Sequence, residues 1–205
     1  MDKKVGKRKV QAAKTKNNIL ETAKKMILEH GFDNVSVDSI VEEAGVSKGA
    51  FYVHFESKDI LASQIIKDYV NKIDMDYKDY LIGLEGTVST YEVIILMAEK
   101  IADVLENKIG YDNMRVLYKA HISKTADTSS TTSYDRELYK MFEYILNKGL
   151  STKEIQLNMP VDTLVHHLIL AMRGITFEWC IRYPDFDLKK QFIEHFEILL
   201  NGVFG

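Results

Sequence analysis

The chain has 205 residues, of which 46% are apolar and 28% charged, so it is long enough and apolar enough to bury a sizeable core. Its only two prolines are Pro160 and Pro184, a composition that favours helices over a β-sandwich or barrel. The single cysteine, Cys180, excludes an internal disulfide, and no apolar run reaches the ~18 residues of a membrane span. The sequence also shows no secretory signal, so we expect an all-α, cytoplasmic protein with no membrane partner.

The net charge of −3 is unevenly distributed along the chain. Residues 1–58 contain 11 Lys and Arg against 8 Asp and Glu, whereas residues 59–205 are acidic. Residues 1–14 alone hold six Lys and Arg and one Asp, and we interpret them as a basic, flexible arm. Such an arm is either a solvated tail or a contact with nucleic acid, and its composition leaves both open.

Three short helices are predicted between residues 15 and 58. Apolar residues from Ile19 to Ile27 recur at steps of three and four, which indicates the first helix. Ser36 is placed to cap the second helix, and Ser47 follows a tight turn and is placed to cap the third. Three short helices with such a turn before the third predict a helix-turn-helix domain.

The third predicted helix has two distinct faces. At about 100° per residue, Phe51 and Phe55 point together into a small core, and Gly49 and Val53 lie opposite them. The flanks of this outward face carry Lys48, Ala50, Tyr52 and His54. A helix with such small side chains fits a major groove about 12 Å wide, where Lys48 can donate to guanine and Val53 can contact thymine methyl groups. The same pattern also fits any small three-helix unit, so taken alone it leaves simple core packing open.

Residues 15–23 (TKNNILETA), 31–32 (GF) and 36–61 (SVDSIVEEAGVSKGAFYVHFESKDIL) follow one another in uninterrupted register. This part of the chain resembles the TetR family of bacterial transcriptional regulators. The resemblance implies a homodimer whose subunits each have a helix-turn-helix (residues 15–58) and a helical ligand-binding and dimerisation domain (residues 59–205). Such a dimer would place two recognition helices about 34–36 Å apart on a pseudo-palindromic operator in double-stranded DNA.

The resemblance also implies individual DNA contacts. Thr15 and Ser36 correspond to positions at the starts of the first two helices, and Lys58 to a phosphate ligand at the start of the fourth. The sequence departs from the family at Lys16, where Arg is frequent, and at Val35, where a Thr hydroxyl is common. Together with the helix faces, the predicted DNA-binding residues are Thr15, Lys16, Ser36, Ser47, Lys48, Gly49, Ala50, Tyr52, Val53, His54 and Lys58.

Six further helices are predicted after residue 58, giving about nine in total. They lie near residues 58–81, 91–106, 113–124, 134–148, 160–183 and 188–203. The helix at 160–183 is apolar on two faces and the last helix on one, so we expect these two to pair with the same helices of a second subunit in a four-helix bundle. The predicted dimer residues are Leu164, Ala171, Gly174, Phe192, Phe196, Leu199 and Val203.

Met and aromatic residues are concentrated in the centre of the larger domain. In a protein that resembles the TetR family, such residues often line a cavity for an apolar or aromatic effector, because Met adapts its shape. At helical spacing, the same residues are also ordinary core. The predicted ligand-binding residues are Met97, Met114, Tyr118, Phe142, Met172, Phe177 and Trp179.

The sequence predicts no cofactor, metal site or enzymatic activity. His166 and His167 are adjacent and diverge on a helix, and no phosphate-binding loop or catalytic motif is present. The leading interpretation is a repressor that an unidentified small-molecule effector releases from its operator. The alternative is an architectural DNA-bound factor that recruits a protein partner without an effector. A closed aromatic cavity would favour the repressor, and an exposed acidic or apolar patch without a cavity would favour the architectural factor.

Overall fold

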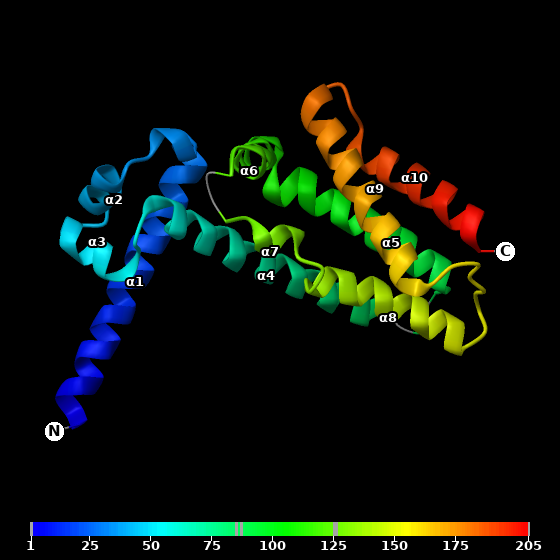
Figure 1. The fold of residues 1–205 in the computed structure, drawn as a ribbon, viewed down its shortest axis with the longest axis horizontal. Coiled ribbons are helices and arrows are strands. Elements are labelled where there is room, and N and C mark those ends of the chain that lie inside the picture. Colours follow the sequence, from blue (N-terminus) through cyan, green and yellow to red (C-terminus); the bar gives the residue numbers. More distant parts are fainter. Residues whose placement is uncertain (1, 85, 87, 125–126, 205) are drawn as a thin grey trace. The chain divides into compact units, whose positions relative to one another are not determined.

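The structure, a computed structural model, is all-helical in the part of the chain that it describes. It describes residues 2–84, 86, 88–124 and 127–204, with the backbone alone at residues 2–7, 28 and 33. The α-helices are α1 (Asp2–His30), α2 (Val37–Glu43), α3 (Lys48–His54), α4 (Lys58–Leu84), α5 (Thr90–Asp103), α6 (Tyr111–Ser123), α7 (Ser129–Thr132), α8 (Glu137–Ser151), α9 (Val161–Arg182) and α10 (Leu188–Val203) (Figure 1). The predicted fold class is confirmed.

The helices form two compact units. The N-terminal unit consists of residues 1–69 and 119–130, and the C-terminal unit of residues 70–118 and 131–205. The structure therefore divides the chain about three helical turns later than the predicted boundary at residue 58. The physical reason is that Leu61 and Ala62, in the first turn of α4, are buried in the N-terminal unit.

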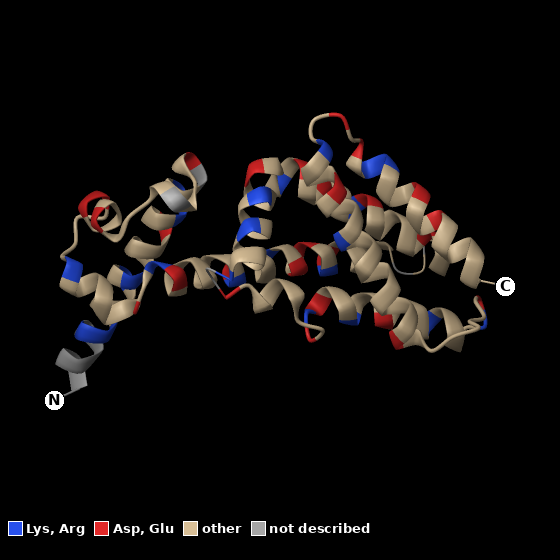
Figure 2. Ribbon diagram, turned by 45° about the horizontal axis from the view of Figure 1, so that its top comes forward, with Lys and Arg blue, Asp and Glu red and all other residues tan. Residues whose placement is uncertain are grey.

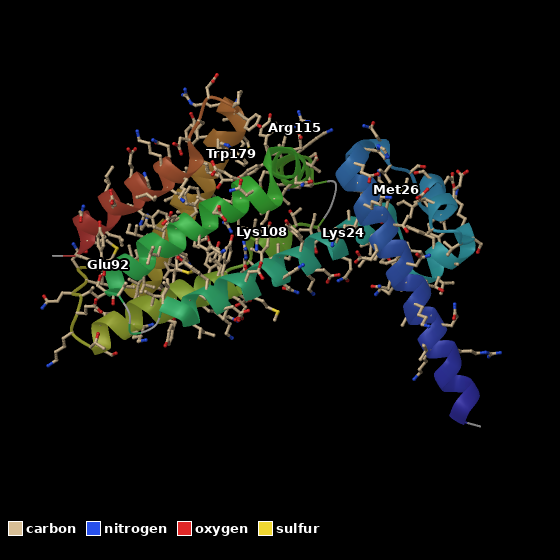
Figure 3. All side chains as sticks on the ribbon, turned by 180° about the vertical axis from the view of Figure 1, so that it is seen from behind. Lys24, Met26, Glu92, Lys108, Arg115 and Trp179 are labelled. Atoms are coloured by element: carbon tan, nitrogen blue, oxygen red, sulfur yellow. The ribbon has the colours of Figure 1, made fainter. Side chains whose placement is uncertain are left out.

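One small core holds α1, α2, α3 and the start of α4 together in the N-terminal unit. The two phenylalanines predicted to point inwards, Phe51 and Phe55, are both buried in it, with ring centroids 5.7 Å apart. Val35 stands where Thr is common in the TetR family, and it is buried in the same core. The apolar side chain at this position therefore contributes to packing. Met26 of α1 packs at the edge of this core (Figure 3).

The predicted flexible arm is helical in the structure. α1 begins at Asp2, and Thr15 lies in the middle of this 29-residue helix. Residues 8–14 are mainly Arg, Lys, Gln and Ala, which are strong helix formers, and they contain neither Gly nor Pro. They are all exposed, whereas the side chains of Lys3, Lys4 and Lys7 lie outside the described residues. Residues 8–14 of the arm are thus an exposed basic part of α1.

The C-terminal unit is a bundle in which α5 packs against α8 and α10, and α9 packs against the same two helices (Figure 1). Its centre is aromatic: the ring centroids of Phe142 and Phe196 are 6.3 Å apart, and Phe192 stacks on Phe196. α4 is joined to the start of α8 by a buried ion pair in which Arg136 contacts Asp74 at 2.7 Å. In the described residues, strand-like pairing is limited to one bridge between Leu157 and Phe204.

Four of the predicted dimer residues lie inside their own subunit instead. They are Leu164, Phe192, Phe196 and Val203, all of which are buried. The remaining three differ in exposure: Ala171 and Leu199 are half-buried, and Gly174 is exposed. The apolar periodicity of α10 identified the face that is buried, but α5 and α9 of the same chain cover that face.

α9 is long and apolar enough to cross a membrane, by length and composition alone. Core helices of globular proteins pass the same test, and α9 packs against α8 and α10. Leu164, Leu168 and Met172 recur on one face at steps of four and are all buried within the unit.

Candidate nucleic-acid interface

α3 presents a small exposed face opposite its two buried phenylalanines. Val53 is 79% exposed and Tyr52 is half exposed, whereas Phe51 is buried on the same helix. Gly49 is also exposed, and a Cβ added there would have only the Ser47 hydroxyl near it, at 3.9 Å. The fold therefore does not require glycine at this position. The missing side chain leaves the backbone of α3 open to close approach at this point, and the DNA contact predicted for Gly49 remains a prediction.

Lys48, at the start of α3, is paired with Asp38 of α2. The ammonium nitrogen lies 2.7 Å from Asp38 Oδ1, and both side chains are more than half exposed. The hydrogen bond to this carboxylate raises the pKa of Lys48 above its ordinary value, so the cation is retained. An exposed pair of this kind contributes little stability, so Lys48 can exchange Asp38 for an acceptor on DNA. Sequence reasoning missed Asp38, because no local spacing connects it with Lys48.

The hydroxyls of Ser36 and Ser47 cap the helices as predicted. Ser36 Oγ accepts from the backbone N–H of Ser39 at 3.0 Å, and Ser47 Oγ accepts from that of Ala50 at 3.1 Å. The Asn18 side chain donates to the Ala44 carbonyl at 2.8 Å, which ties α1 to the end of α2. These bonds fix the angle at which α3 is presented, and the DNA contacts predicted for the two serines remain predictions.

Thr15 lies elsewhere than predicted, and Lys58 begins α4 as predicted but with its ammonium engaged by the protein. Thr15 does not start a helix, and its hydroxyl donates to the Gln11 carbonyl at 3.1 Å inside α1. The Lys58 ammonium is directed into the N-terminal unit, where it donates to the carbonyls of Phe32 and Val35, each at 2.9 Å. It also lies 4.0 Å from the centroid of the Phe32 ring. Lys58 therefore orders the connection between α1 and α2 in this structure.

The remaining predicted positions surround the exposed face of α3. Lys16 is exposed on α1, with its ammonium 5.6 Å from the centroid of the Phe55 ring. Ala50 and His54 are half-buried on α3. Lys and Arg residues occur along α1 and at the start of α3 in this unit (Figure 2).

The residues predicted to bind an effector differ in exposure within the C-terminal unit. Met97, Met114, Phe142, Met172 and Trp179 are buried, Tyr118 is half-buried and Phe177 is partly exposed. The rings of Tyr118 and Phe177 contact each other, and the Tyr118 hydroxyl donates to the Arg173 carbonyl at 3.1 Å. A cavity of about 400 Å³ lies elsewhere in the unit, and none of the seven residues lines it. Their ligand role remains a prediction.

In the described residues, the single cysteine is not activated and the possible metal ligands are not clustered. Burial raises the pKa of the Cys180 thiol to about 11, so it is protonated at neutral pH and a poor nucleophile. No three His, Cys, Asp or Glu side chains come together as metal ligands in this part of the chain.

Comparison with known proteins agrees with this geometry. Residues 19–65 match the model of bacterial regulatory proteins of the tetR family. The HTH-type transcriptional regulator AcrR of Shigella flexneri is 24% identical over 95% of this chain and 91% of its own length.

Solved structures share the whole fold. A TetR-family transcriptional regulator from Mesorhizobium loti matches 95% of this chain and 98% of its own, with a TM-score of 0.73 and 15% identity. The transcriptional repressor FadR from Thermus thermophilus, in complex with lauroyl-CoA, matches 91% of this chain and 94% of its own, with a TM-score of 0.71 and 16% identity. The family match over the helix-turn-helix and the shared fold of the helical C-terminal unit support assignment of this chain to the TetR family of bacterial transcriptional regulators.

Proposed function

We propose that the protein is a cytoplasmic, homodimeric repressor that leaves a pseudo-palindromic operator when a small, mainly apolar or aromatic molecule binds its C-terminal unit. The exposed face of α3 carries the proposal, because Gly49 and Val53 leave room for a groove edge while Phe51 anchors the helix from behind. TetR-family regulators bind DNA operators and act as dimers. The lauroyl-CoA held by the Thermus FadR structure supports a small-molecule effector of this chain.

Release from DNA would require only a modest coupling free energy between ligand binding in the C-terminal unit and DNA binding in the N-terminal unit. α4 is one continuous helix from Lys58 in the N-terminal unit to Leu84 in the C-terminal unit. A ligand that changes the tilt of α4 would change the separation of the two α3 helices in a dimer. A coupling of about 1–3 kcal/mol would lower operator affinity about 5- to 150-fold.

The experiment that tests this function is selection of sheared genomic DNA of the source organism on the purified protein at two salt concentrations. A repressor is expected to recover one or a few pseudo-palindromic sites that survive moderate salt. Recovery of DNA spread evenly over the genome and lost steeply with salt would mean purely electrostatic binding, and the architectural alternative would replace the repressor.

Exposed apolar residues on α9 provide a dimer surface in place of the buried residues of α10. Leu170 is 55% exposed and Ile181 is 62% exposed, and Gly174 and Phe177 are exposed between them. Steps of four, three and four place these residues on one face of the helix. Such a face is costly to leave in water, and a second copy of the same face would cover it.

We predict that Leu170→Glu converts the dimer to a monomer, because two carboxylates would be buried in the contact without partners. Sedimentation equilibrium measures the change, and operator affinity is expected to fall with it. Met75→Glu, which alters another exposed apolar residue of the same unit, is the matched control and should leave the dimer intact. A dimeric Leu170→Glu protein would show that this face of α9 is not the interface.

A further inference from the structure

The first half of α1 is an exposed, positively charged helix. None of the side chains of residues 8–18 is buried, and the core of the N-terminal unit begins at Ile19. Residues 3–20 contain seven Lys and Arg and neither Asp nor Glu. The next carboxylate along α1 is that of Glu21, which lies 4.0 Å from the ammonium of Lys24. The segment therefore carries positive charge that no acid of its own offsets.

One face of this segment lies on the side of α3. The Lys16 ammonium is 5.6 Å from the centroid of the Phe55 ring, and Phe55 caps the C-terminal end of α3. Lys9 precedes Lys16 by seven residues and lies about 20° from it around the helix, so the two share this face. Arg8 is about 80° from Lys16, whereas Lys14 is about 160° away, on the opposite side of α1.

The face that Lys9 and Lys16 share continues beyond α3. At about 1.5 Å per residue, Lys9 lies about 10 Å further along the helix axis than Lys16. Within the N-terminal unit, α1 extends past α3 towards the N-terminus (Figure 1). A major groove that held α3 would be about 12 Å wide and bordered by two phosphate backbones. A cation at this distance is therefore placed to reach phosphates beside the groove rather than base edges within it.

Arg8 and Lys9 are available for such a contact. Both side chains are exposed, and neither forms an ion pair in the described part of the chain. Lys48 differs in this respect, because it must first leave the carboxylate of Asp38. Contacts from Lys and Arg to phosphates carry no sequence information, but they raise the affinity for any duplex and make it depend on salt.

From this geometry we propose that Arg8 and Lys9 bind phosphates of double-stranded DNA beside the groove that α3 enters. α1 thereby extends the DNA-binding surface beyond the helix-turn-helix. Neither residue is among the DNA contacts predicted from the sequence. The inference goes beyond the proposed function, because it requires binding to duplex DNA but neither an operator nor an effector.

The test measures binding of the full chain to a fluorescent DNA duplex of mixed sequence, by anisotropy over a series of salt concentrations. Lys9→Gln is expected to reduce the slope of log K against log salt by about 0.9 per bound subunit, the value for one phosphate contact. This slope corresponds to binding about eightfold weaker at about 0.1 M salt than that of the natural chain. Arg8→Gln should have a similar effect.

Lys14→Gln is the matched control, because it removes the same charge from an exposed lysine on the opposite side of the same segment. It should change the slope much less than Lys9→Gln does. All three variants alter exposed residues, so their unfolding temperatures are expected to equal that of the natural chain. Equal effects of Lys9→Gln and Lys14→Gln would overturn the assignment to one face.

A double variant separates a positioned cation from the net charge of the segment. Lys9→Gln with Gln11→Lys keeps the net charge but moves the cation to a position about 140° from Lys16. It is expected to bind the duplex as weakly as Lys9→Gln alone. Recovery of the natural affinity would show that only the net charge matters, and would overturn the proposal.

The outcome for α1 is separate from that for the proposed function. A chain that binds the mixed-sequence duplex through Lys9 but selects no operator from genomic DNA would keep this inference and refute the proposed function. A chain that selects an operator, but whose Lys9→Gln variant has an unchanged salt slope, would keep the proposed function and refute this inference.

Discussion

Replacing Phe51 with alanine is expected to unfold the N-terminal unit and abolish operator binding. Phe51 is completely buried at the centre of the core formed by α1, α2, α3 and the start of α4. Truncating a buried phenylalanine costs about 3–5 kcal/mol, which is a large share of the stability of so small a unit. Amide hydrogen exchange resolved along the chain measures the change, because it separates the N-terminal unit from the C-terminal one.

Tyr52→Ala is the matched control for Phe51→Ala, since it alters the neighbouring aromatic residue on the exposed side of α3. It should change stability by no more than about 0.5 kcal/mol and leave hydrogen exchange unchanged. Operator affinity is expected to fall about tenfold, equivalent to about 1.4 kcal/mol. Normal operator binding by the Tyr52→Ala protein would contradict the assignment of this face to DNA.

Asp74→Asn is expected to destabilise the C-terminal unit by about 3–5 kcal/mol. Arg136 donates to Asp74 through two nitrogens, with Nη2 at 2.7 Å and Nε at 3.0 Å from Oδ1. Removing the carboxylate charge leaves the guanidinium buried without its counter-ion, and this uncompensated charge is the main cost. Chemical denaturation followed by circular dichroism measures the loss, with hydrogen exchange assigning it to α4 and α8.

Two further variants separate the cost of leaving a charge unpaired inside the protein from the effect of losing an exposed ion pair. Asp76→Asn breaks the exposed pair of Asp76 with Lys108 and should have a much smaller effect (Figure 3). The double variant Asp74→Leu with Arg136→Met replaces both charges by apolar groups and should be more stable than Asp74→Asn. A double variant as unstable as the single one would mean that packing, not the unpaired charge, determines the loss.

Local features of the structure could be predicted from the sequence, because each depends on a few neighbouring residues. Ser36 and Ser47 both cap helices as expected, since capping requires only a side-chain oxygen and the backbone N–H groups that follow it. The inward orientation of Phe51 and Phe55 follows in the same way from their spacing of four residues.

Features that depend on contacts distant in the sequence could not be predicted. Periodicity identified the apolar face of α10 but could not tell whether Phe192 and Phe196 face their own subunit or a second one. The proposed surface on α9 was missed because Leu170 lies within the continuous apolar run of residues 168–172, where sequence alone does not separate exposed from buried positions. The cavity in the C-terminal unit has no local pattern either, because Leu81, Val93 and Ile145 of its lining come from three separate helices.

Lys58 and Leu61 determine how the N-terminal unit responds to any movement of α4. The Lys58 ammonium holds the carbonyls of Phe32 and Val35 to the first turn of α4, and Leu61 is buried in the same core as Phe51. These contacts tie the first turn of α4 to the segment before α2 and to the core that contains Phe51. We therefore expect a movement of this turn to carry α2 and α3 with it. In a dimer, the two N-terminal units would then leave the DNA by changing their spacing, with each recognition helix keeping its own shape.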